Sequence, residues 1–218
     1  MKLRIVSSPG HIKSLKTIYI AARTCYSEKT EKELEKEFTI EKAQRLIAQL
    51  MDKGHHSVIE HCSITFAIEG ISRACGNQLV RHRICSISQQ SQRFCKVSTE
   101  DEDWYVIPES FIGHTFEETY RETMKTAAWQ YETAIQCGIP KEDARFMLPN
   151  ACKTNVVFTM NFRELLHFFQ LRCCLSAQWE IREMAYKMLD FCKLHYKDIF
   201  EYAGPPCVRD ECKDRCDK

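Results

Sequence analysis

The sequence lacks the features that mark several large classes of protein. It carries almost no net charge, because 31 Lys and Arg residues balance 30 Asp and Glu residues. A charge of +1 produces no overall field that would hold nucleic acid or an anionic membrane, so any anion site has to be local. No apolar run approaches the roughly 20 residues that a membrane-spanning helix needs. We therefore expect a protein that binds neither nucleic acid nor membranes.

We also expect no secretory leader, and the chain has few turn residues. Its opening, MKLRIVSSPG, contains only a short apolar stretch, so we expect a cytoplasmic protein. The 7 Gly and 6 Pro are scattered, without linkers or repeats, through 218 residues. At roughly 150 residues per domain, this length predicts a single domain over residues 1–218, large enough to fold without disulfides. Neither Gly-x-Gly-x-x-Gly nor Gly-x4-Gly-Lys occurs, so side chains must do much of any phosphate binding.

Cysteine, by contrast, is abundant at 13 residues. The count is odd and most cysteines fall within apolar patterns, which indicates buried thiols in a reducing compartment. The exceptions are Cys207, Cys212 and Cys216, which lie in a charged segment. We interpret residues 201–218 as an exposed tail; the alternative is a metal or redox role for its cysteines.

The spacing of apolar residues predicts several helices around a small sheet. Helices are expected over residues 12–26, 40–53, 72–81, 115–136, 162–174 and 177–196, and strands over 61–69, closed by Gly70, over 105–107 and over 154–160. The charged stretch 28–38 indicates an exposed segment, and the polar stretch 84–95 indicates a loop. This pattern predicts an α+β fold with a small, mostly antiparallel sheet.

The stretch that says most about chemistry is residues 78–93, QLVRHRICSISQQSQR. It places Arg81, Arg83 and Arg93, together with His82, around a loop rich in Ser and Gln. Guanidinium groups bind phosphate through paired hydrogen bonds, and Gln side chains both donate and accept, so the set suits a phosphorylated nucleotide. On composition alone, a solvated basic loop is the alternative.

Arg172 is a second candidate, because helical spacing places it on an apolar face. It follows Phe168 and Phe169 by one turn of helix. A buried, unpaired cation is costly, so Arg172 must reach water, pair with an acid such as Glu180, or contact a ligand.

Three weaker features complete the set. Arg163 and His167 share a more polar face of the same helix with Gln170. Residues 54–61, GHHSVIEH, are rich in His, but their order and spacing are wrong for a zinc helix, so we expect no metal there. The residues of this segment could donate hydrogen bonds to an aromatic ligand. The alternative is that they form only a loop before a strand. Arg145 by itself is an ordinary arginine at a helix end.

Taken together, these residues resemble a known family. RHRICSISQQS fits the Arg-His-Arg-x7-Ser signature of flavin-dependent thymidylate synthases, with Arg81, His82, Arg83 and Ser91 at the four fixed places. Flanking blocks agree in order over about residues 54–190, among them EHCSITFAIEG, ARFMLPN, NFRELLHFFQLR and AQWEIREMA. Five ordered blocks carry the resemblance, where one short signature would not.

The resemblance implies an enzyme that methylates dUMP to dTMP. Methylenetetrahydrofolate supplies the carbon unit in such enzymes, and FAD reduced by NADPH supplies the hydride. The subunits are α+β and form a homotetramer, in which each active site draws residues from more than one subunit. The family contacts to FAD fall on Ser57, Arg81, His82, Arg83, Gln89, Asn161, Phe162, Arg163 and His167, the last being often Asn in the family. The family contacts to dUMP fall on Gln78, Leu79, Val80, Arg81, Gln89, Gln90, Ser91, Gln92, Arg93, Arg145 and Arg172.

The resemblance also makes Arg172 the catalytic residue, set against the pyrimidine so that its ionised, electron-rich form is favoured. A guanidinium does not lose its proton near neutral pH, so it stabilises charge and does not act as a base. Ser91 would need a base to become a nucleophile, and the signature offers only His82. We therefore expect Ser91 to position dUMP.

Two other functions compete with this one. A cysteine-dependent thymidylate synthase uses a Pro-Cys-His arrangement, and GPPCV at 204–208 has the Pro-Cys pair without the His. A nucleotide- or RNA-binding module without catalysis would interleave aromatic residues with the basic ones. Residues 78–93 contain no aromatic side chain, and only Phe94 follows.

Overall fold

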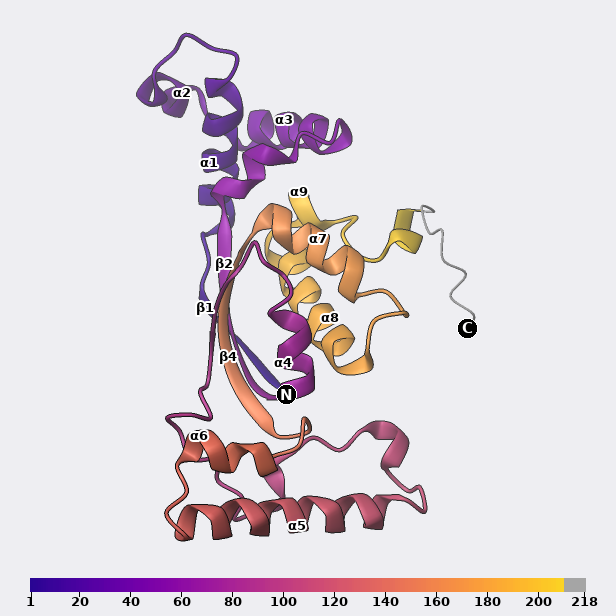
Figure 1. Ribbon diagram of the computed structural model, residues 1–218. Coiled ribbons are helices and arrows are strands. Elements are labelled where there is room, and N and C mark those ends of the chain that lie inside the picture. Colours follow the sequence, from indigo (N-terminus) through magenta and orange to yellow (C-terminus); the bar gives the residue numbers. More distant parts are fainter. Residues whose placement is uncertain (210–218) are drawn as a thin grey trace. The chain divides into compact units, whose positions relative to one another are not determined.

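The computed structural model describes residues 1–209 (Figure 1). The strands are β1 (Lys2–Ser7), β2 (Ser63–Ser72), β3 (Ser86–Gln89) and β4 (Lys153–Asn161). The helices are α1 (His11–Thr24), α2 (Glu31–Glu37), α3 (Ile40–Asp52), α4 (Arg73–Leu79), α5 (Glu117–Gln136), α6 (Lys141–Ala144), α7 (Phe162–Arg172), α8 (Trp179–His195) and α9 (Lys197–Phe200). The strands pair as one antiparallel sheet in the order β1-β2-β4-β3, so the predicted α+β class is confirmed.

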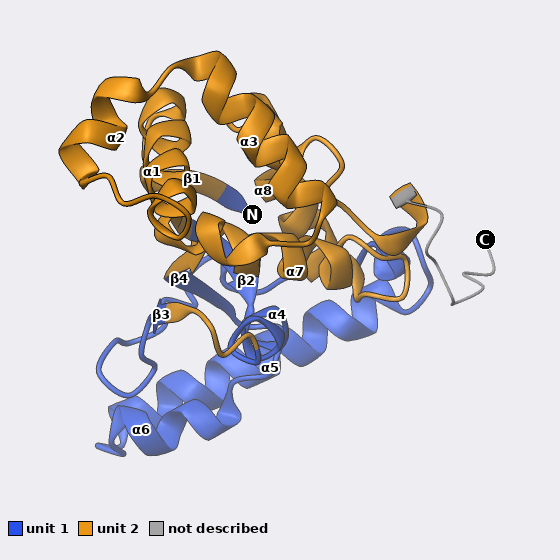
Figure 2. Cartoon of the chain, turned by 90° about the horizontal axis from the view of Figure 1, so that it is seen from above, with its two compact units in different colours: residues 1–2, 68–81, 87–157 blue, residues 3–67, 82–86, 158–218 orange. Residues whose placement is uncertain are grey.

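The chain separates into two compact units (Figure 2). The α5 unit contains residues 1–2, 68–81 and 87–157, and the α7 unit contains residues 3–67, 82–86 and those from 158 onward. Strands β2 and β4 run from one unit into the other. The single domain expected over residues 1–218 stays a prediction.

The α7 unit is built on a core of aromatic and aliphatic side chains. Helix α7 packs against α8, and α1 packs against α3. Phe162 is fully buried, with its ring centroid 4.9 Å from that of Tyr196 and 5.3 Å from that of Phe200. These contacts hold the first turn of α7 rigidly in the core.

The α5 unit has a smaller core of its own. Trp104, Tyr105, Met124 and Cys152 form its buried cluster, and Ile107, Tyr120 and Leu148 pack against it at the edge. This cluster attaches the long helix α5 to the start of β4.

Two helices begin at the residue directly after a strand, because each strand ends in a capping side chain. Ser72 ends β2 and its hydroxyl accepts a hydrogen bond from the Cys75 backbone N–H at 3.0 Å, which starts α4. Asn161 ends β4 and its Oδ1 accepts from the Glu164 backbone N–H at 2.8 Å, which starts α7. Such caps satisfy backbone donors that the first turn leaves open. They fix the rotation of both helices relative to their strands.

Several predicted boundaries are wrong. Gly70 does not close β2, which continues to Ser72. Gly70 adopts a left-handed φ of +76° within the strand, and its N–H donates to the Asn155 side chain at 3.2 Å. The charged stretch 28–38 is not simply exposed, because it contains α2, whose Leu34 is fully buried.

Short strands were the hardest elements to predict. The expected loop 84–95 contains β3, and the expected strand 105–107 is only an isolated bridge between Tyr105 and Cys152. The first strand, β1, was not anticipated at all. Each of these elements is too short for a clear alternation of apolar residues.

The expectation of buried thiols outside the tail is confirmed only in part, because Cys25, Cys95 and Cys137 are exposed. Cys62, Cys75 and Cys192 are all buried, and burial raises the pKa of the Cys62 thiol to about 11. The expected exposed tail needs correction, because Ala203 and Pro205 are buried while Cys207 is exposed. Cys212 and Cys216 lie outside the described residues.

Among residues 1–209, no helix combines the length and apolarity required to cross a membrane.

We predict that Phe162→Ala lowers the free energy of unfolding by about 3–5 kcal/mol, because it leaves a cavity among three packed rings. Urea denaturation followed by circular dichroism measures this. Tyr26→Ala is the control, since Tyr26 is 81% exposed, and its effect should stay within about 0.5 kcal/mol. Equal effects of the two substitutions would contradict the assignment of Phe162 to the core.

Candidate active site

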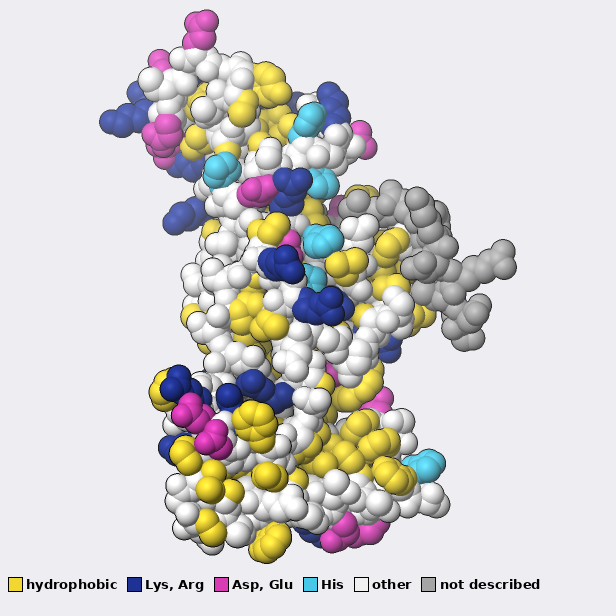
Figure 3. All heavy atoms as spheres, viewed as in Figure 1, with side chains coloured by type: hydrophobic (Ala, Val, Ile, Leu, Met, Phe, Trp, Pro, Cys, Tyr) yellow, Lys and Arg dark blue, Asp and Glu magenta, His cyan; other side chains and the backbone are white. Residues whose placement is uncertain are grey.

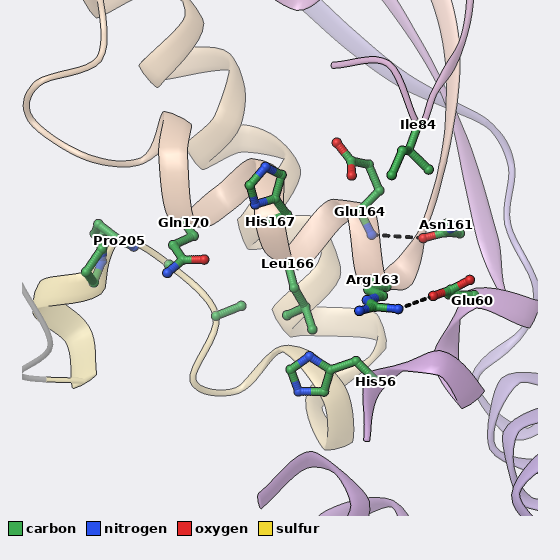
Figure 4. Close-up of a pocket in the computed structure, with 13 residues that line it drawn as sticks. His56, Glu60, Ile84, Asn161, Arg163, Glu164, Leu166, His167, Gln170 and Pro205 are labelled. Atoms are coloured by element: carbon green, nitrogen blue, oxygen red, sulfur yellow. Dashed lines mark hydrogen bonds and ion pairs between the residues drawn. The ribbon is translucent and has the colours of Figure 1, made fainter. Parts of the chain in front are cut away.

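A cavity of about 570 Å³ lies beside α7 in the α7 unit (Figure 4). Its volume falls within the range of small-molecule sites, about 300–1,000 Å³. Its polar lining comes from His56, Glu60, Asn161, Arg163, Glu164, His167 and Gln170. Its apolar lining comes from Ile84, Leu166, Ala203, Pro205 and Pro206. We refer to it as the α7 cavity.

One face of α7 supplies much of the polar lining. Arg163, His167 and Gln170 are spaced i, i+4 and i+7, so they share a face, as the sequence predicted. Basic and histidine side chains gather over α7 in the surface view (Figure 3). The Arg163 guanidinium donates to Glu60 Oε1 at 2.5 Å, which holds it at the cavity (Figure 4).

A chain of three polar side chains runs from Glu164, which lines the α7 cavity, through His82 to Arg172 at the end of α7. Arg172 Nε donates to His82 Nε2 at 3.0 Å, and His82 Nδ1 lies 3.3 Å from Glu164 Oε1. The side chains of His82 and Glu164 are only 4% and 6% exposed. The polar group that meets Arg172 here is therefore the histidine of the Arg-His-Arg signature, a partner that the sequence did not suggest.

These contacts determine the protonation of His82. A guanidinium has donors only, so the His82 nitrogen that faces Arg172 must be unprotonated and accept. A neutral imidazole then carries its proton on Nδ1, which faces the Glu164 carboxylate and donates to it. His82 is thus a neutral imidazole in a single tautomer.

The electrostatic surroundings agree with this assignment. Burial lowers the pKa of His82 to about 4, and the nearby Arg172 and His167 act in the same direction. Burial also raises the pKa of Glu164, an effect that His167 opposes. At neutral pH, His82 therefore stays neutral.

The α5 unit contains a second cavity, of about 260 Å³. It is lined by Gln90, Ser91 and Gln92 from the signature loop, together with Lys96 and Lys153. The Ser91 hydroxyl accepts a hydrogen bond from the Arg93 backbone N–H at 3.2 Å. Among the described lining residues, none is a histidine or a carboxylate, so this cavity offers Ser91 neither of these bases.

A third cavity, of about 250 Å³, brings two arginines together in the α5 unit. Arg73 and Arg145 line it, along with Asn77, Gln92 and Asn150. Both arginines are held by backbone carbonyls. Arg73 Nη1 donates to Gln90 O at 3.3 Å, and Arg145 Nε donates to Glu142 O at 2.9 Å.

The remaining predicted contacts lie in varied surroundings. Leu79 and Phe162 are fully buried, so their side chains belong to the core and only their backbone groups remain for a ligand. The exposed residues are Ser57, Val80, Arg81, Arg83 and Arg93, and the half-buried ones are Gln78 and Gln89. Arg93 forms an ion pair with Glu142 at 2.5 Å.

Sequence reasoning missed Glu164 and Arg73. Glu164 lies one turn before Phe168 and two turns before Arg172, so a carboxylate on the apolar face of α7 was the available signal. Arg73 directly follows the strand that ends at Ser72, but a single arginine at a helix start carries no distinctive pattern.

Comparison with known proteins identifies the family of the chain. The family described as "Thymidylate synthase complementing protein" matches residues 10–196. A flavin-dependent thymidylate synthase of Geobacter sulfurreducens is 43% identical over 197 residues, covering 90% of this chain and 85% of the relative. Proteins of the same name from Clostridium tetani and Pyrococcus horikoshii are 41% and 44% identical, covering 91% and 90% of this chain and 86% and 84% of their own lengths. The chain belongs to the flavin-dependent thymidylate synthase family. This match extends over segments of both units, so the family resemblance seen in the signature is confirmed.

We predict that His82 makes stability depend on pH between about pH 6.5 and 4. An unfolded histidine takes up its proton near pH 6.5, whereas folded His82 has a pKa of about 4. The unfolded chain thus binds more protons in this window, and the free energy of unfolding falls as the pH falls. In His82→Phe the fall should be shallower by up to about 1.4 kcal/mol per pH unit.

Urea denaturation at several pH values measures both slopes. Identical slopes for the wild type and His82→Phe would show that His82 is not held neutral in the folded protein.

Proposed function

We propose that the α7 cavity holds the flavin of a thymidylate synthase and that the cavities of the α5 unit hold its nucleotide. By family, the chain is an FAD-dependent thymidylate synthase, which converts dUMP to dTMP with methylenetetrahydrofolate as carbon donor and NADPH as reductant. The observation that carries the assignment of the site is the bond between His82, in the signature, and Arg172, which lies two residues beyond Gln170 in the lining of the α7 cavity.

The residues of the α7 cavity fit FAD. A flavin ring needs apolar walls with a few hydrogen-bonding groups, and Leu166, Ile84 and the segment 203–206 provide such walls. A diphosphate needs a cation, and Arg163 has five N–H donors, more than its contact with Glu60 uses. When bound, FAD supplies the hydride for reduction of the new methyl group.

The protein's own groups bind and orient. Arg163, His167 and Gln170 contact the cofactor from one face of α7. The family position of Arg172 is against the pyrimidine, where a guanidinium that cannot deprotonate favours the ionised ring. The local dielectric is low on this buried side of α7, which strengthens that interaction.

We assign the dUMP phosphate to the third cavity. Arg73 and Arg145 face it from different elements, and each is oriented by a backbone carbonyl that leaves further N–H donors open. Paired guanidinium groups are well suited to a phosphate dianion. Ser91 and the adjacent Gln side chains then position the nucleotide, since the described lining of their cavity offers no histidine or carboxylate to activate Ser91.

We also propose that the protein works as a homotetramer in the cytoplasm. Large apolar side chains remain exposed on the subunit, notably Trp129 at 67%, Phe146 at 78% and Leu194 at 78%. Contacts between subunits would remove these side chains from water, which favours assembly. The buried thiols of Cys62 and Cys192 are compatible with a reducing compartment.

We predict that the purified protein shows a flavin absorbance band, and that NADPH bleaches this band faster when dUMP is present. Arg163→Ala should weaken FAD binding by about tenfold or more, because it removes a charge-assisted hydrogen bond. The control is Lys187→Ala on α8, where Lys187 forms a surface ion pair with Glu183 at 2.6 Å.

Absorbance of the desalted protein and titration with FAD measure these effects. A colourless wild-type protein that neither takes up FAD nor responds to dUMP would overturn the proposed function.

We predict that Arg172→Ala lowers turnover of dUMP by at least about 100-fold, the scale of losing a preorganised charge at a reacting group. Ser91→Ala should leave measurable turnover, because Ser91 positions the nucleotide without forming a bond to it. Production of dTMP by both variants, with their melting temperatures, tests the pair. Complete and equal loss of activity in two folded variants would contradict these roles.

A further inference from the structure

We propose that Glu164 is a positioning residue for Arg172, acting through His82. The inference rests on the proposed function only in that Arg172 is taken as the catalytic guanidinium. It assigns a task to a carboxylate that neither the signature nor the family contacts include.

The position of Glu164 in α7 is one from which a glutamate usually bonds to the backbone of the capping residue and not to a histidine. Glu164 is the third residue of α7, the place from which a glutamate commonly reaches back to the backbone N–H of the capping residue. In α2 of the same unit, Glu33 does this, and its carboxylate accepts from the Thr30 N–H at 2.8 Å. In α7 the carboxylate of Glu164 instead contacts the edge of the His82 ring, with Oε1 3.3 Å from Nδ1. The Glu164 side chain is buried there. Glu164, in the first turn of α7, therefore contacts the signature histidine His82 in place of its own capping residue.

The ring of His82 is fixed in its plane by a different contact. Phe168 packs edge-on against it with centroids 4.8 Å apart. This contact is apolar, so it does not distinguish the two tautomers of a neutral imidazole. Selection between them requires a polar group at one of the ring nitrogens.

Glu164 provides that selection. A carboxylate accepts, so it favours the tautomer with the proton on Nδ1, which leaves Nε2 free to accept from Arg172. In the other tautomer, Nε2–H would face the N–H of Arg172, and two donors would oppose each other in a buried site. That arrangement is costly, and Arg172 would turn away. Glu164 therefore holds the guanidinium by fixing the proton on the far side of the ring.

The test compares Glu164→Gln with Glu164→Met in the full-length protein. Gln keeps a side-chain oxygen that accepts from Nδ1–H, whereas Met fills similar space without an acceptor. We expect Glu164→Met to lower kcat by about 10- to 100-fold, the scale of misplacing a catalytic group by about 1 Å. Glu164→Gln should stay near the wild-type kcat. Glu33→Met is the matched control, because it removes a carboxylate at the same position of α2 and should leave kcat unchanged.

Two measurements separate positioning from general loss of structure. Because Glu164 also lines the α7 cavity, FAD content and flavin reduction by NADPH without dUMP are measured first in Glu164→Met, and the dUMP-dependent step should slow by a larger factor than this reduction does. In a His82→Phe background, Glu164→Met should cost little more, since the link to Arg172 is already absent. Calorimetric titration with dUMP, which needs no turnover, should show weaker binding in Glu164→Met than in Glu164→Gln.

Wild-type kcat in Glu164→Met, equal losses in the Gln and Met variants, or additive losses in the His82→Phe background would each overturn the inference. If Glu164→Met does not fold, Glu164→Asp replaces it. The shorter carboxylate of Asp keeps the charge but moves the acceptor away from His82 Nδ1. Glu164→Gln should therefore retain more activity than Glu164→Asp. The reverse order would overturn the inference. Failure of the proposed function would be seen separately, in a wild-type protein that neither binds dUMP nor retains FAD.

Discussion

The bond from Arg172 to a neutral His82 is the interaction on which the rest of the site depends. It requires an unprotonated Nε2, and this in turn requires a buried ring with an acceptor at Nδ1. The acceptor, Glu164, is on the first turn of α7 and Arg172 is on its last, so one helix presents both groups to the same imidazole. The helix takes this rotation because β4 ends in the cap formed by Asn161. The position of Arg172 thus follows from a strand end eleven residues earlier in the sequence.

The cations of this protein differ in how their charge is balanced. Arg163 and Arg93 each pair with a carboxylate, at Glu60 and Glu142, and such exposed pairs add little to stability. Arg172 donates to the neutral ring of His82. That bond orients the guanidinium without placing a negative charge beside it, which suits a group that must stabilise a developing anion. A histidinium at position 82 would repel Arg172, so the low pKa of His82 is required for the contact.

Sequence reasoning was most successful where a long apolar period exists. Helices α1, α3, α5, α7 and α8 were all predicted within a few residues, because each is long enough to show a helical period or is followed by a Gly or Pro that marks its end. Sequence reasoning failed at short elements. The four residues of β3 are too few to show an alternation of apolar side chains, and α2 buries only Leu34, so it shows no helical period. The polar face of α7 was predicted, since Arg163, His167 and Gln170 are neighbours by spacing alone. The contact of Arg172 with His82 was not, because the two residues are 90 positions apart and nothing local relates them.

Exposure alternates along the Arg-His-Arg signature, so this short motif can both bind an anionic ligand and place an imidazole in the core. Arg81 and Arg83 are exposed, whereas His82 between them is buried. Neighbouring side chains in an irregular, extended segment point to different sides, so two cations remain available to an anionic ligand while the imidazole enters the core of the α7 unit. An arginine in place of His82 would add a donor and a charge beside Arg172, and an aliphatic residue would remove the acceptor. A neutral imidazole is the side chain that accepts from Arg172 at one nitrogen and donates to Glu164 at the other, and this double requirement suits histidine at position 82 of this chain.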